Sequence, residues 1–535
     1  MRTYDYIVVG AGSAGCVLAN RLAAHAKVLL VEAGGADTRR EIRIPAAFPK
    51  LFKSSVDWAY YTESEAQLNH RRMYWPRGKV LGGCSAINAM IYIRGHRRDY
   101  DAWRDAGNPG WGFDDVLPYF LRSEKNERGD SRFHSSAGLL PVSDLRCPNL
   151  LSRAFIEACE ERGIPRNDDF NGPEQEGAGL YQVNQSRGER WSSARAFLGA
   201  RPRPRNLTIV SGAQATRIRI EKQLAAGIEY VAHGATQRAF ADDEIILACG
   251  SVNSPHLLML SGVGPAEHLR KHGIPVNCDL PGVGRNLQDH LAVGVLYQCT
   301  KPVTLDRCEN LWNLGSYLLR RQGPFTSNVA EGGAFVRSRE ELDIPDLQYL
   351  FGPAYFINHG FTRPEGCGFS VGVLQLRPES RGCIELRSAD PYVPPIIRAN
   401  YLTDDLDRRT VLAGLRIAQR IATARAFDRW RGAPYLPASR ASNDAELREH
   451  VREHSQTMYH PVGTCKMGAD DMAVVDAQLR VHGIRRLRIA DASVMPTMIG
   501  GNTNAPTVMI AEKAAAMILK REEHLVLPTA QRAEE

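Results

Sequence analysis

The chain has 535 residues, of which 43% are hydrophobic, a composition typical of a globular protein with a large core and two or more domains. Its net charge of +7 is modest and its arginine-rich stretches are short and interrupted by proline, which argues against a nucleic-acid-binding protein. The eleven cysteines are scattered without CxxC or CxxH spacing, which argues against a disulfide framework and against a metal site.

Location follows from what the sequence lacks. No uncharged apolar run is long enough to span a bilayer, so no transmembrane segment is expected. The first predicted strand starts too close to residue 1 to leave room for a secretory leader. Scattered thiols suit a reducing compartment, so we expect a cytoplasmic protein, with a loose membrane association left open.

Residues 4–32 predict a βαβ dinucleotide site. An apolar run at 6–9 predicts a strand, GAGSAG predicts a sharp turn into a helix, and a second apolar run at 28–31 ends at Glu32. Gly10 permits the turn, Gly12 lets the backbone approach a pyrophosphate, and Gly15 lets the helix pack closely. The motif alone does not separate NAD from FAD. The predicted contacts are Gly10, Gly12, Ser13, Ala14, Gly15, Glu32 and Ala33.

Glu32 and the helix start have separate predicted tasks. Exposed N–H groups at the helix N-terminus face the phosphates. The Glu32 carboxylate accepts hydrogen bonds from a ribose, which favours an unphosphorylated ribose over a 2′-phosphate.

A second glycine-dense stretch, RGKVLGGCSAIN, covers residues 77–88 and is followed by an apolar run at 90–93. Backbone this rich in glycine can run alongside a flat ligand. The apolar residues belong in a core, which argues against a simple surface loop. The predicted ligand contacts in and after this stretch are Gly78, Val80, Gly83, Ser85, Asn88, Ala89, Met90 and Ile91.

RGKVLGGCSAINAMIYIRG resembles the first signature of the glucose–methanol–choline (GMC) oxidoreductases, and GSVNSPHLLMLSGVG at 250–264 resembles the second. The phrases GNPGWGFDDVLPYF, LPGVGRNLQDHL, YHPVGTCKMG and LRIADASVMP also resemble the family's bacterial alcohol dehydrogenases. Cys84 stands where the first signature usually has a small hydroxyl residue or glycine. The resemblance runs from the first strand to about residue 520.

The resemblance implies FAD as the cofactor, and an α/β plus α+β fold. In this fold a Rossmann-like FAD-binding domain is interleaved with a substrate domain built on an antiparallel sheet. We expect the FAD-binding domain at 1–155, 200–300 and 455–520, the substrate domain at 156–199 and 301–454, and a C-terminal tail at 521–535.

The remaining expected elements follow from apolar patterns. Paired strands are expected at 206–220, with Ala215 where the family contacts adenine through its backbone, and a further strand at 244–249. Antiparallel strands are expected at 368–376 and 383–387, a helix at 411–422, a return to the FAD-binding domain at 480–490 and a helix at 507–520.

Oxidation of an alcohol requires a base for the hydroxyl proton, and histidine is the natural candidate near neutral pH. His460 is one of fifteen histidines and lies in MYHPVGT, between the substrate region and the returning FAD-binding region. From the residues alone, a histidine hydrogen-bonded in an interdomain core is equally acceptable. The resemblance implies catalysis, because the family's catalytic histidine occupies this motif.

The family's second catalytic position is histidine or asparagine, and Asn502 and Asn504 both lie in range. Counting without gaps from Asp491 gives Asn502 that position and leaves Asn504 as a turn residue that touches flavin or substrate. Asp491 and Ala492 resemble the family's late contact to the flavin pyrophosphate or ribityl chain, so the resemblance implies that they touch FAD. Some members attach FAD covalently to a histidine at the position of Ile87, a linkage that isoleucine cannot form, so we expect non-covalent FAD.

Substrate signals are weaker. Choline-specific members usually carry a histidine where this chain has Leu350, so a neutral primary alcohol is preferred and choline dehydrogenase is the alternative. The predicted substrate contacts are Leu350, Glu331, Met458 and Tyr459. A lyase or light-driven decarboxylase on the same fold is a further alternative. The electron acceptor, whether oxygen, a quinone or another compound, and the oligomeric state leave no trace in the sequence.

Overall fold

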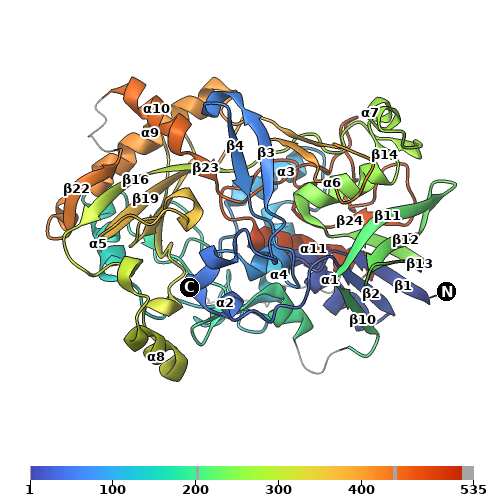
Figure 1. The fold of residues 1–535 in the computed structure, drawn as a ribbon, viewed down its shortest axis with the longest axis horizontal. Coiled ribbons are helices and arrows are strands. Elements are labelled where there is room, and N and C mark those ends of the chain that lie inside the picture. Colours follow the sequence, from blue (N-terminus) through green and yellow to red (C-terminus); the bar gives the residue numbers. More distant parts are fainter. Residues whose placement is uncertain (1, 200–203, 438–442, 521–535) are drawn as a thin grey trace, which may run out of the picture.

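The computed structural model describes residues 2–199, 204–437 and 443–520, which form two seven-stranded sheets joined by helices and long loops (Figure 1). The described helices are α1 (Ser13–Ala23), α2 (Arg40–Arg43), α3 (Arg97–Asp105), α4 (Phe113–Ser123), α5 (Leu150–Glu160), α6 (Gly250–Leu260), α7 (Ala266–Lys271), α8 (Leu311–Arg320), α9 (Asp405–Ala422), α10 (Asp444–His454) and α11 (Asn504–Ile518). None of these described helices is long and apolar enough to cross a membrane.

The first sheet is mainly parallel. Its strands are β10 (Leu207–Ser211), β2 (Val28–Glu32), β1 (Arg2–Val9), β13 (Ala235–Leu247), β12 (Leu224–Ala232) and β11 (Ala213–Glu221) in that order, with β24 (Leu487–Ile489) beside β13. β10, β2, β1, β13 and β24 run parallel, whereas β12 and β11 are antiparallel to their neighbours. Every residue of β2 is buried, as expected for a strand covered on both faces.

The second sheet is antiparallel. Its strands are β22 (Arg431–Leu436), β16 (Leu291–Cys299), β19 (Gly368–Gln375), β18 (Leu347–Gly352), β17 (Gly332–Val336) and β7 (Gly177–Leu180) in that order, with β23 (Gln456–Thr457) beside β16. α9 and α5 pack against this sheet. The predicted fold class, a Rossmann-like unit combined with an antiparallel sheet, is confirmed.

Five two-stranded ribbons complete the described strands. They are β3 (Tyr60–Glu65) with β4 (Arg71–Trp75), β5 (Glu124–Asn126) with β6 (Leu140–Val142), β8 (Gln185–Ser186) with β9 (Glu189–Arg190), β14 (Val263–Gly264) with β15 (Cys278–Asp279), and β20 (Cys383–Glu385) with β21 (Ile396–Arg398).

Three expected elements differ in the structure. The strands in 206–220 are not each other's partners, because β10 pairs with β2 while β11 pairs with β12. The run at 383–387 forms β20, which pairs with β21 outside the large antiparallel sheet. The last helix begins at Asn504, three residues earlier than expected, since the Asn-Ala-Pro turn supplies its first residues.

In two places the expected domain ranges do not follow the sheets that the strands join. β16 and β23 are hydrogen-bonded in the antiparallel sheet, yet they fall in ranges expected for the FAD-binding domain. Sequence periodicity gives the type of a strand but not its partner, which explains the difference. The predicted tail at 521–535 lies outside the described residues.

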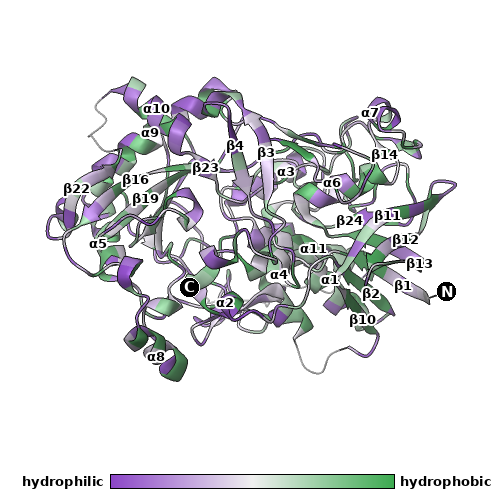
Figure 2. Ribbon diagram, in the orientation of Figure 1, coloured by the Kyte–Doolittle hydropathy of each residue, from purple (hydrophilic) through white to green (hydrophobic). Residues whose placement is uncertain are grey.

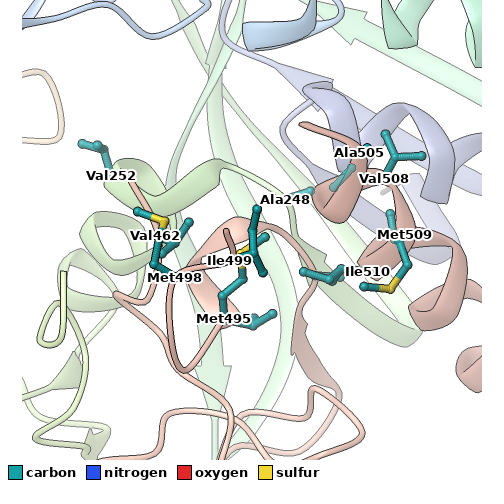
Figure 3. Packing of buried hydrophobic residues seen from close by; sticks show 14 of the residues in the cluster. Ala248, Val252, Val462, Met495, Met498, Ile499, Ala505, Val508, Met509 and Ile510 are labelled. Atoms are coloured by element: carbon teal, nitrogen blue, oxygen red, sulfur yellow. The ribbon is translucent and has the colours of Figure 1, made fainter. Parts of the chain in front are cut away.

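A buried apolar cluster connects the helices that surround the site (Figure 3). Met495, Met498 and Ile499, in the loop after β24, lie between Val252 of α6 and Ile510 of α11. All five side chains are nearly inaccessible to solvent. The packing holds the loop that carries residues 500–503 against both helices, so the side chains of that loop have fixed positions.

Candidate active site

The turn between β1 and α1 is built from glycines, so its backbone is not covered by side chains at the edge of the parallel sheet. Gly10 has φ +96°, and a Cβ there would lie 2.6 Å from the carbonyl oxygen of Ala248. A Cβ at Gly15 would lie 1.8 Å from the Gly10 oxygen, so only glycine lets α1 pack against the turn. At Gly12 the nearest atom to a Cβ would be 3.9 Å away, because this residue faces a cavity.

A cavity of about 860 Å³ extends from this turn to the antiparallel sheet, at the large end of the range for cofactor and small-molecule sites. The structure brings most of the predicted contacts to its wall. They are Gly10, Gly12, Ser13, Ala14, Glu32, Ala33, Gly78, Gly83, Asn88, Ala89, Met90, Ile91, Ala215, Leu350, Met458, Tyr459, His460, Asp491, Ala492, Asn502 and Asn504.

Three predicted cofactor contacts support the cavity from behind. Gly15 lies in the contact between α1 and the turn. Val80 is fully buried in an apolar cluster with Phe48. Ser85 donates to the Gly82 oxygen at 2.6 Å and accepts from the Ser193 amide at 2.9 Å. Gly15 therefore shapes the turn before α1, Val80 and Ser85 shape the glycine-dense loop, and none of the three lines the cavity.

Glu331 is a wrong prediction. Its side chain is 1% exposed and accepts hydrogen bonds from the Asn149 amide at 2.7 Å and from the hydroxyls of Ser152 and Ser327 at 2.7 and 2.6 Å. Burial raises the pKa of this carboxyl. The carboxylate ties α5 to the loop before β17 and does not line the cavity. Strand position alone could not reveal this, because Glu331 lies just outside β17 where alternation no longer applies.

Glu32 closes the dinucleotide unit at the end of β2. One carboxylate oxygen accepts from the Ala11 amide and the other from the Gly34 amide, both at 2.8 Å. Burial raises the pKa of Glu32 to about 7. Glu32 lines the cavity, and each of its oxygens can accept a second hydrogen bond. The predicted hydrogen bond to a ribose stays a prediction.

Asp491 lies at the carboxyl end of β24. One oxygen accepts from the Gly250 amide at 2.9 Å and from the Ser254 hydroxyl at 2.6 Å, and the other accepts from the Ser493 amide at 2.8 Å. The carboxylate therefore joins the start of α6 to the returning chain. Asp491 also lines the cavity, which is compatible with the predicted flavin contact. That contact stays a prediction.

The cavity fits the FAD that the sequence resemblance implies. Gly83 approaches the turn so closely that a Cβ on it would lie 2.7 Å from the Gly12 Cα. Gly12 and Gly250 both line the cavity; a Cβ on Gly250 would meet no atom within 4 Å, and one on Gly12 would only touch the Ala248 oxygen at 3.9 Å. The N-terminus of α1 adds amide donors for a pyrophosphate. In the described part of the chain, no cluster of three or more histidine, cysteine or acidic side chains could hold a metal.

His460 sits where the cavity meets the antiparallel sheet. Its Nε2 lies 3.2 Å from the Asn502 amide nitrogen, and its Nδ1 lies 2.9 Å from Nδ1 of His290. The backbone amide of His460 donates to Asp289 at 2.7 Å. The ring is thus held at both nitrogens and at its backbone.

These contacts fix which nitrogen of His460 carries the proton. Nε2 of His290 lies 3.1 Å from the Leu376 carbonyl, which only accepts, so that nitrogen is protonated. Burial lowers the pKa of His290 to about 4, so the ring is neutral and its Nδ1 accepts. His460 therefore donates from Nδ1, and its Nε2 keeps a lone pair directed at Asn502.

Electrostatics keep His460 neutral. Burial, followed by the nearby His290 and Arg77, lowers the pKa of His460 well below its ordinary value. Asp289, which accepts from Thr457 at 2.6 Å and from Tyr401, has a pKa raised to about 6 by burial. The site thus presents an unprotonated imidazole nitrogen at neutral pH.

The two candidate asparagines face different groups. Asn502 accepts from the Gln348 amide at 3.1 Å, which turns its own NH₂ toward His460. Asn504 accepts from the Ser13 hydroxyl at 2.7 Å, at the start of α1. The geometry therefore groups Asn502 with His460 and Asn504 with the dinucleotide turn.

The part of the cavity beside His460 is apolar and aromatic. Leu350 faces the cavity, whereas its neighbours Tyr349 and Phe351 face the opposite side of β18 and are buried in the core. The wall also includes Phe48, Phe52, Val329 and Phe356. Among the described residues, Glu32, Asp491 and the exposed Glu453 are the carboxylates of the lining.

Sequence reasoning missed His290, Asp289, Gln348 and Arg77 as parts of the site. For Asp289 and His290 a signal was available, because the motif LQDHL places an acid and a histidine side by side directly before a strand. Gln348 lies two residues before Leu350 on the same face of β18, so strand alternation could have found it. Arg77, which donates to the Tyr459 carbonyl at 2.6 Å, gave no comparable signal.

Comparisons with known proteins bear on the whole chain. Residues 4–292 match the N-terminal sequence profile described as GMC oxidoreductase, and residues 378–511 match the C-terminal profile. The chain is 46% identical over 530 residues to an alcohol dehydrogenase [acceptor] of Pseudomonas putida, covering 97% of this chain and 96% of that protein. It is 42% identical to the mitochondrial choline dehydrogenase of Homo sapiens, covering 96% and 89% of the two chains.

A solved structure, pyridoxine 4-oxidase from Mesorbium loti, superposes with a TM-score of 0.88 at 34% identity, covering 96% of this chain and 98% of the other. The chain belongs to the GMC oxidoreductase family.

Proposed function

We propose that the protein is an FAD-dependent enzyme that oxidises a primary alcohol to an aldehyde. The observation that carries the proposal is the hydrogen-bonded series His290, His460 and Asn502 at the wall of the cavity that also contains the dinucleotide turn. Relatives named alcohol dehydrogenase and choline dehydrogenase, each aligned over nearly the whole chain, support this reaction class.

The chain's residues supply the proton chemistry. A hydroxyl brought to this point finds an acceptor in Nε2 of His460 and a donor in the amide of Asn502. Gln348 keeps the Asn502 amide oriented. The NH₂ group of Asn502 stabilises the negative charge that develops on the alcohol oxygen. FAD, when bound, supplies the acceptor for the hydride that leaves the alcohol carbon.

Non-covalent FAD is part of the proposal. Ile87 is 3% exposed, lines the cavity and has no nucleophilic atom. Acid precipitation of the purified protein should release yellow flavin into the supernatant. Flavin that stays with the precipitated protein would contradict non-covalent binding.

The proposed substrate is a neutral primary alcohol. A desolvated trimethylammonium group needs carboxylates or free aromatic faces. Aromatic rings line the cavity at Phe48, Phe52 and Phe356, but among the described residues its lining carboxylates are Glu32 and Asp491 at the dinucleotide unit and the exposed Glu453. The exposed rings of Tyr61 and Phe361 already face Lys53, whose Nζ lies 4.5 Å from the Phe361 centroid. The proposal therefore depends on the lack, among the described residues, of a buried carboxylate partner for a cation in the substrate half of the cavity. The 42% identity to a named choline dehydrogenase keeps choline as the competing candidate.

One experiment tests reaction and substrate together. The FAD-loaded protein is mixed with candidate alcohols without oxygen, and loss of flavin absorbance is followed. An aliphatic or benzylic alcohol should bleach the flavin faster than choline at equal concentration. Faster bleaching by choline would reverse the substrate assignment, and no bleaching by any alcohol would favour a lyase or light-driven reaction.

We also place the protein in the cytoplasm. All eleven cysteines are unpaired, which suits a reducing compartment. Measuring peroxide during turnover, with and without a quinone, will identify the electron acceptor.

A further inference from the structure

Helix α8 presents large apolar side chains to solvent. Leu311, Trp312 and Leu319 are each at least 85% exposed, and Leu318 is 59% exposed. Of the other large apolar side chains that are exposed in the described ranges, Tyr61 and Phe361 both lie against Lys53 and Tyr74, and Leu150, Tyr392 and Met472 belong to separate segments of the chain. α8 projects from the lower edge of the molecule in Figure 1, and Figure 2 shows hydrophobic colour on its outer side. Such a contiguous patch marks an interaction surface.

The exposed apolar side chains share one face of the helix. At about 100° per residue, Leu311, Trp312, Leu318 and Leu319 fall within an arc of about 120° around Gly315. Tyr317 lies on the opposite side and is 1% exposed. A periodic apolar face directed outward is therefore a property of the sequence and not of a frayed end.

The opposite face anchors α8 to the body of the protein. The Tyr317 hydroxyl donates to the Arg43 carbonyl at 3.5 Å, and its ring lies 6.0 Å from that of Phe325. Asn310 caps the first turn by accepting from the Asn313 amide at 2.9 Å. The helix is thus held in place while its apolar face stays uncovered by any described residue.

Arginines at the two ends of α8 leave its surroundings with an excess of positive charge. The helix contains no acidic residue; Arg307 precedes it, Arg320 is its last residue and Arg321 follows it. The two acids before the helix are engaged elsewhere: Asp306 accepts from the Tyr355 and Gly368 amides, and Glu309 pairs with Lys50 and Arg363. Within the described ranges no ion pair joins Arg307 or Arg320 to a carboxylate, whereas Arg321 pairs with Glu189 at 3.2 Å. The whole chain carries a net charge of +7. An anionic partner surface is therefore complementary to this face.

The N-terminal end of α8 is tied to the rim of the cavity. Glu309 pairs with Lys50 at 3.0 Å and with Arg363 at 3.4 Å. Lys50 lies in the segment that places Phe48 at the cavity wall, and Arg363 follows the exposed Phe361. The apolar face and the cavity rim thus belong to connected loops.

We propose that the exposed face of α8, formed by Leu311, Trp312, Leu318 and Leu319, docks on the surface of an anionic lipid bilayer. An outward apolar arc with tryptophan and leucine, flanked by arginines, has the composition of a helix that lies in the bilayer interface. The helix is too short to span a membrane, so it rests on the surface. The inference does not depend on the proposed reaction.

Vesicle flotation tests the proposal with the full chain loaded with FAD. Phosphatidylcholine vesicles with phosphatidylglycerol should carry the protein upward, and vesicles without it should carry less. The double substitution Leu318→Ser and Leu319→Ser should lower the bound fraction roughly tenfold, because it removes apolar transfer energy. Leu150→Ser, at an exposed leucine of α5, is the matched control and should bind as the native chain does.

Two further readouts distinguish bilayer docking from misfolding and from self-association. Brominated lipids should quench tryptophan fluorescence in the native chain more than in Trp312→Phe, since Trp312 is the one exposed tryptophan of the described ranges. FAD content should be the same in all variants. A variant that had unfolded would have lost its FAD. Equal flotation of the double variant, or no flotation of the native chain, would overturn the proposal. So would a dimer in size-exclusion chromatography that the double substitution dissociates, because a second copy would then cover the face.

Discussion

The two halves of the cavity are built in different ways. On the parallel-sheet side the wall is backbone: Gly10, Gly12 and Gly83 leave room where any Cβ would collide or project into the cavity. On the antiparallel-sheet side the wall is side chain: His460, Asn502 and the residues behind them hold one another by hydrogen bonds. The first half is therefore suited to hold a large cofactor, and the second to act on a small substrate.

The two halves of the cavity should therefore affect two different quantities, the reaction rate and the FAD content. Changes on the side-chain wall should alter the reaction and leave cofactor content intact. Changes on the backbone wall should lower cofactor content first. Measuring bound FAD and the rate of anaerobic flavin reduction in the same preparations tests that separation.

The largest expected effect is that of His460→Ala. Loss of the unprotonated Nε2 should slow anaerobic flavin reduction by an alcohol about 10²–10⁴-fold, the usual contribution of a general base. FAD content should stay near the native value. His454→Ala, at an exposed histidine of the cavity rim, is the control. A rate close to native would place the base elsewhere.

Asn502→Ala should have the next largest effect. Removing the amide that faces His460 should slow reduction roughly 10²–10³-fold, as loss of one donor to a developing oxyanion does. Asn504→Ala removes a contact to Ser13 at the dinucleotide turn, so it should act more on FAD retention than on rate. If Asn504→Ala slows reduction more than Asn502→Ala, the two assignments must be exchanged.

Gly83→Ala tests the backbone wall. The new Cβ would lie 2.7 Å from the Gly12 Cα, and φ of +50° disfavours alanine by about 1–2 kcal/mol. We expect FAD to be retained about tenfold more weakly on dilution. Gly35→Ala, where no atom lies within 4 Å of a Cβ, should retain FAD as the native chain does. Equal retention by both variants would show that the close approach is unimportant.

The same contrast explains what the sequence could predict. The backbone wall is encoded locally, because GAGSAG and RGKVLGGCSAIN each specify a turn within a dozen residues. The side-chain wall is assembled from β18, the segment before β16 and the loops after β23 and β24, which only tertiary packing brings together. His460 and Asn502 were accessible through family resemblance, whereas the tautomer set by His290 required the Leu376 carbonyl.

Glu331 shows the limit of reading position alone. A carboxylate beside a strand that lines a cavity is a reasonable candidate for a cation site. Of its actual partners, Ser327 lies four residues earlier in the chain, whereas Asn149 and Ser152 lie about 180 residues earlier. No local pattern marks such distant donors.

A smaller effect is expected along a series of alcohols. Each buried methylene contributes about 0.8 kcal/mol in an apolar pocket, which is roughly a fourfold gain in kcat/KM per carbon until the pocket is filled. Leu350→Ser should flatten this dependence, while Glu331→Ser should not, because Glu331 does not line the cavity. A native enzyme that prefers choline over butanol would contradict the apolar assignment.

The smallest expected effect concerns pH. Burial, His290 and Arg77 lower the pKa of His460, so Nε2 keeps its lone pair through the range in which an ordinary histidine, with a pKa of about 6.5, becomes protonated. The reduction rate should change less than about twofold between pH 8 and 6.5 and fall only in more acidic solution.

Arg77→Gln removes the arginine charge that helps to lower this pKa, so the fall in rate should move to higher pH. Arg72→Gln also changes the cavity wall but removes no charge that acts on His460, so it serves as the control. A native profile that already halves at or above pH 6.5 would mean that the imidazole is less buried during turnover than in the structure. The proton would then be taken by a solvated base, and the side-chain wall would lose the feature that distinguishes it from the backbone wall.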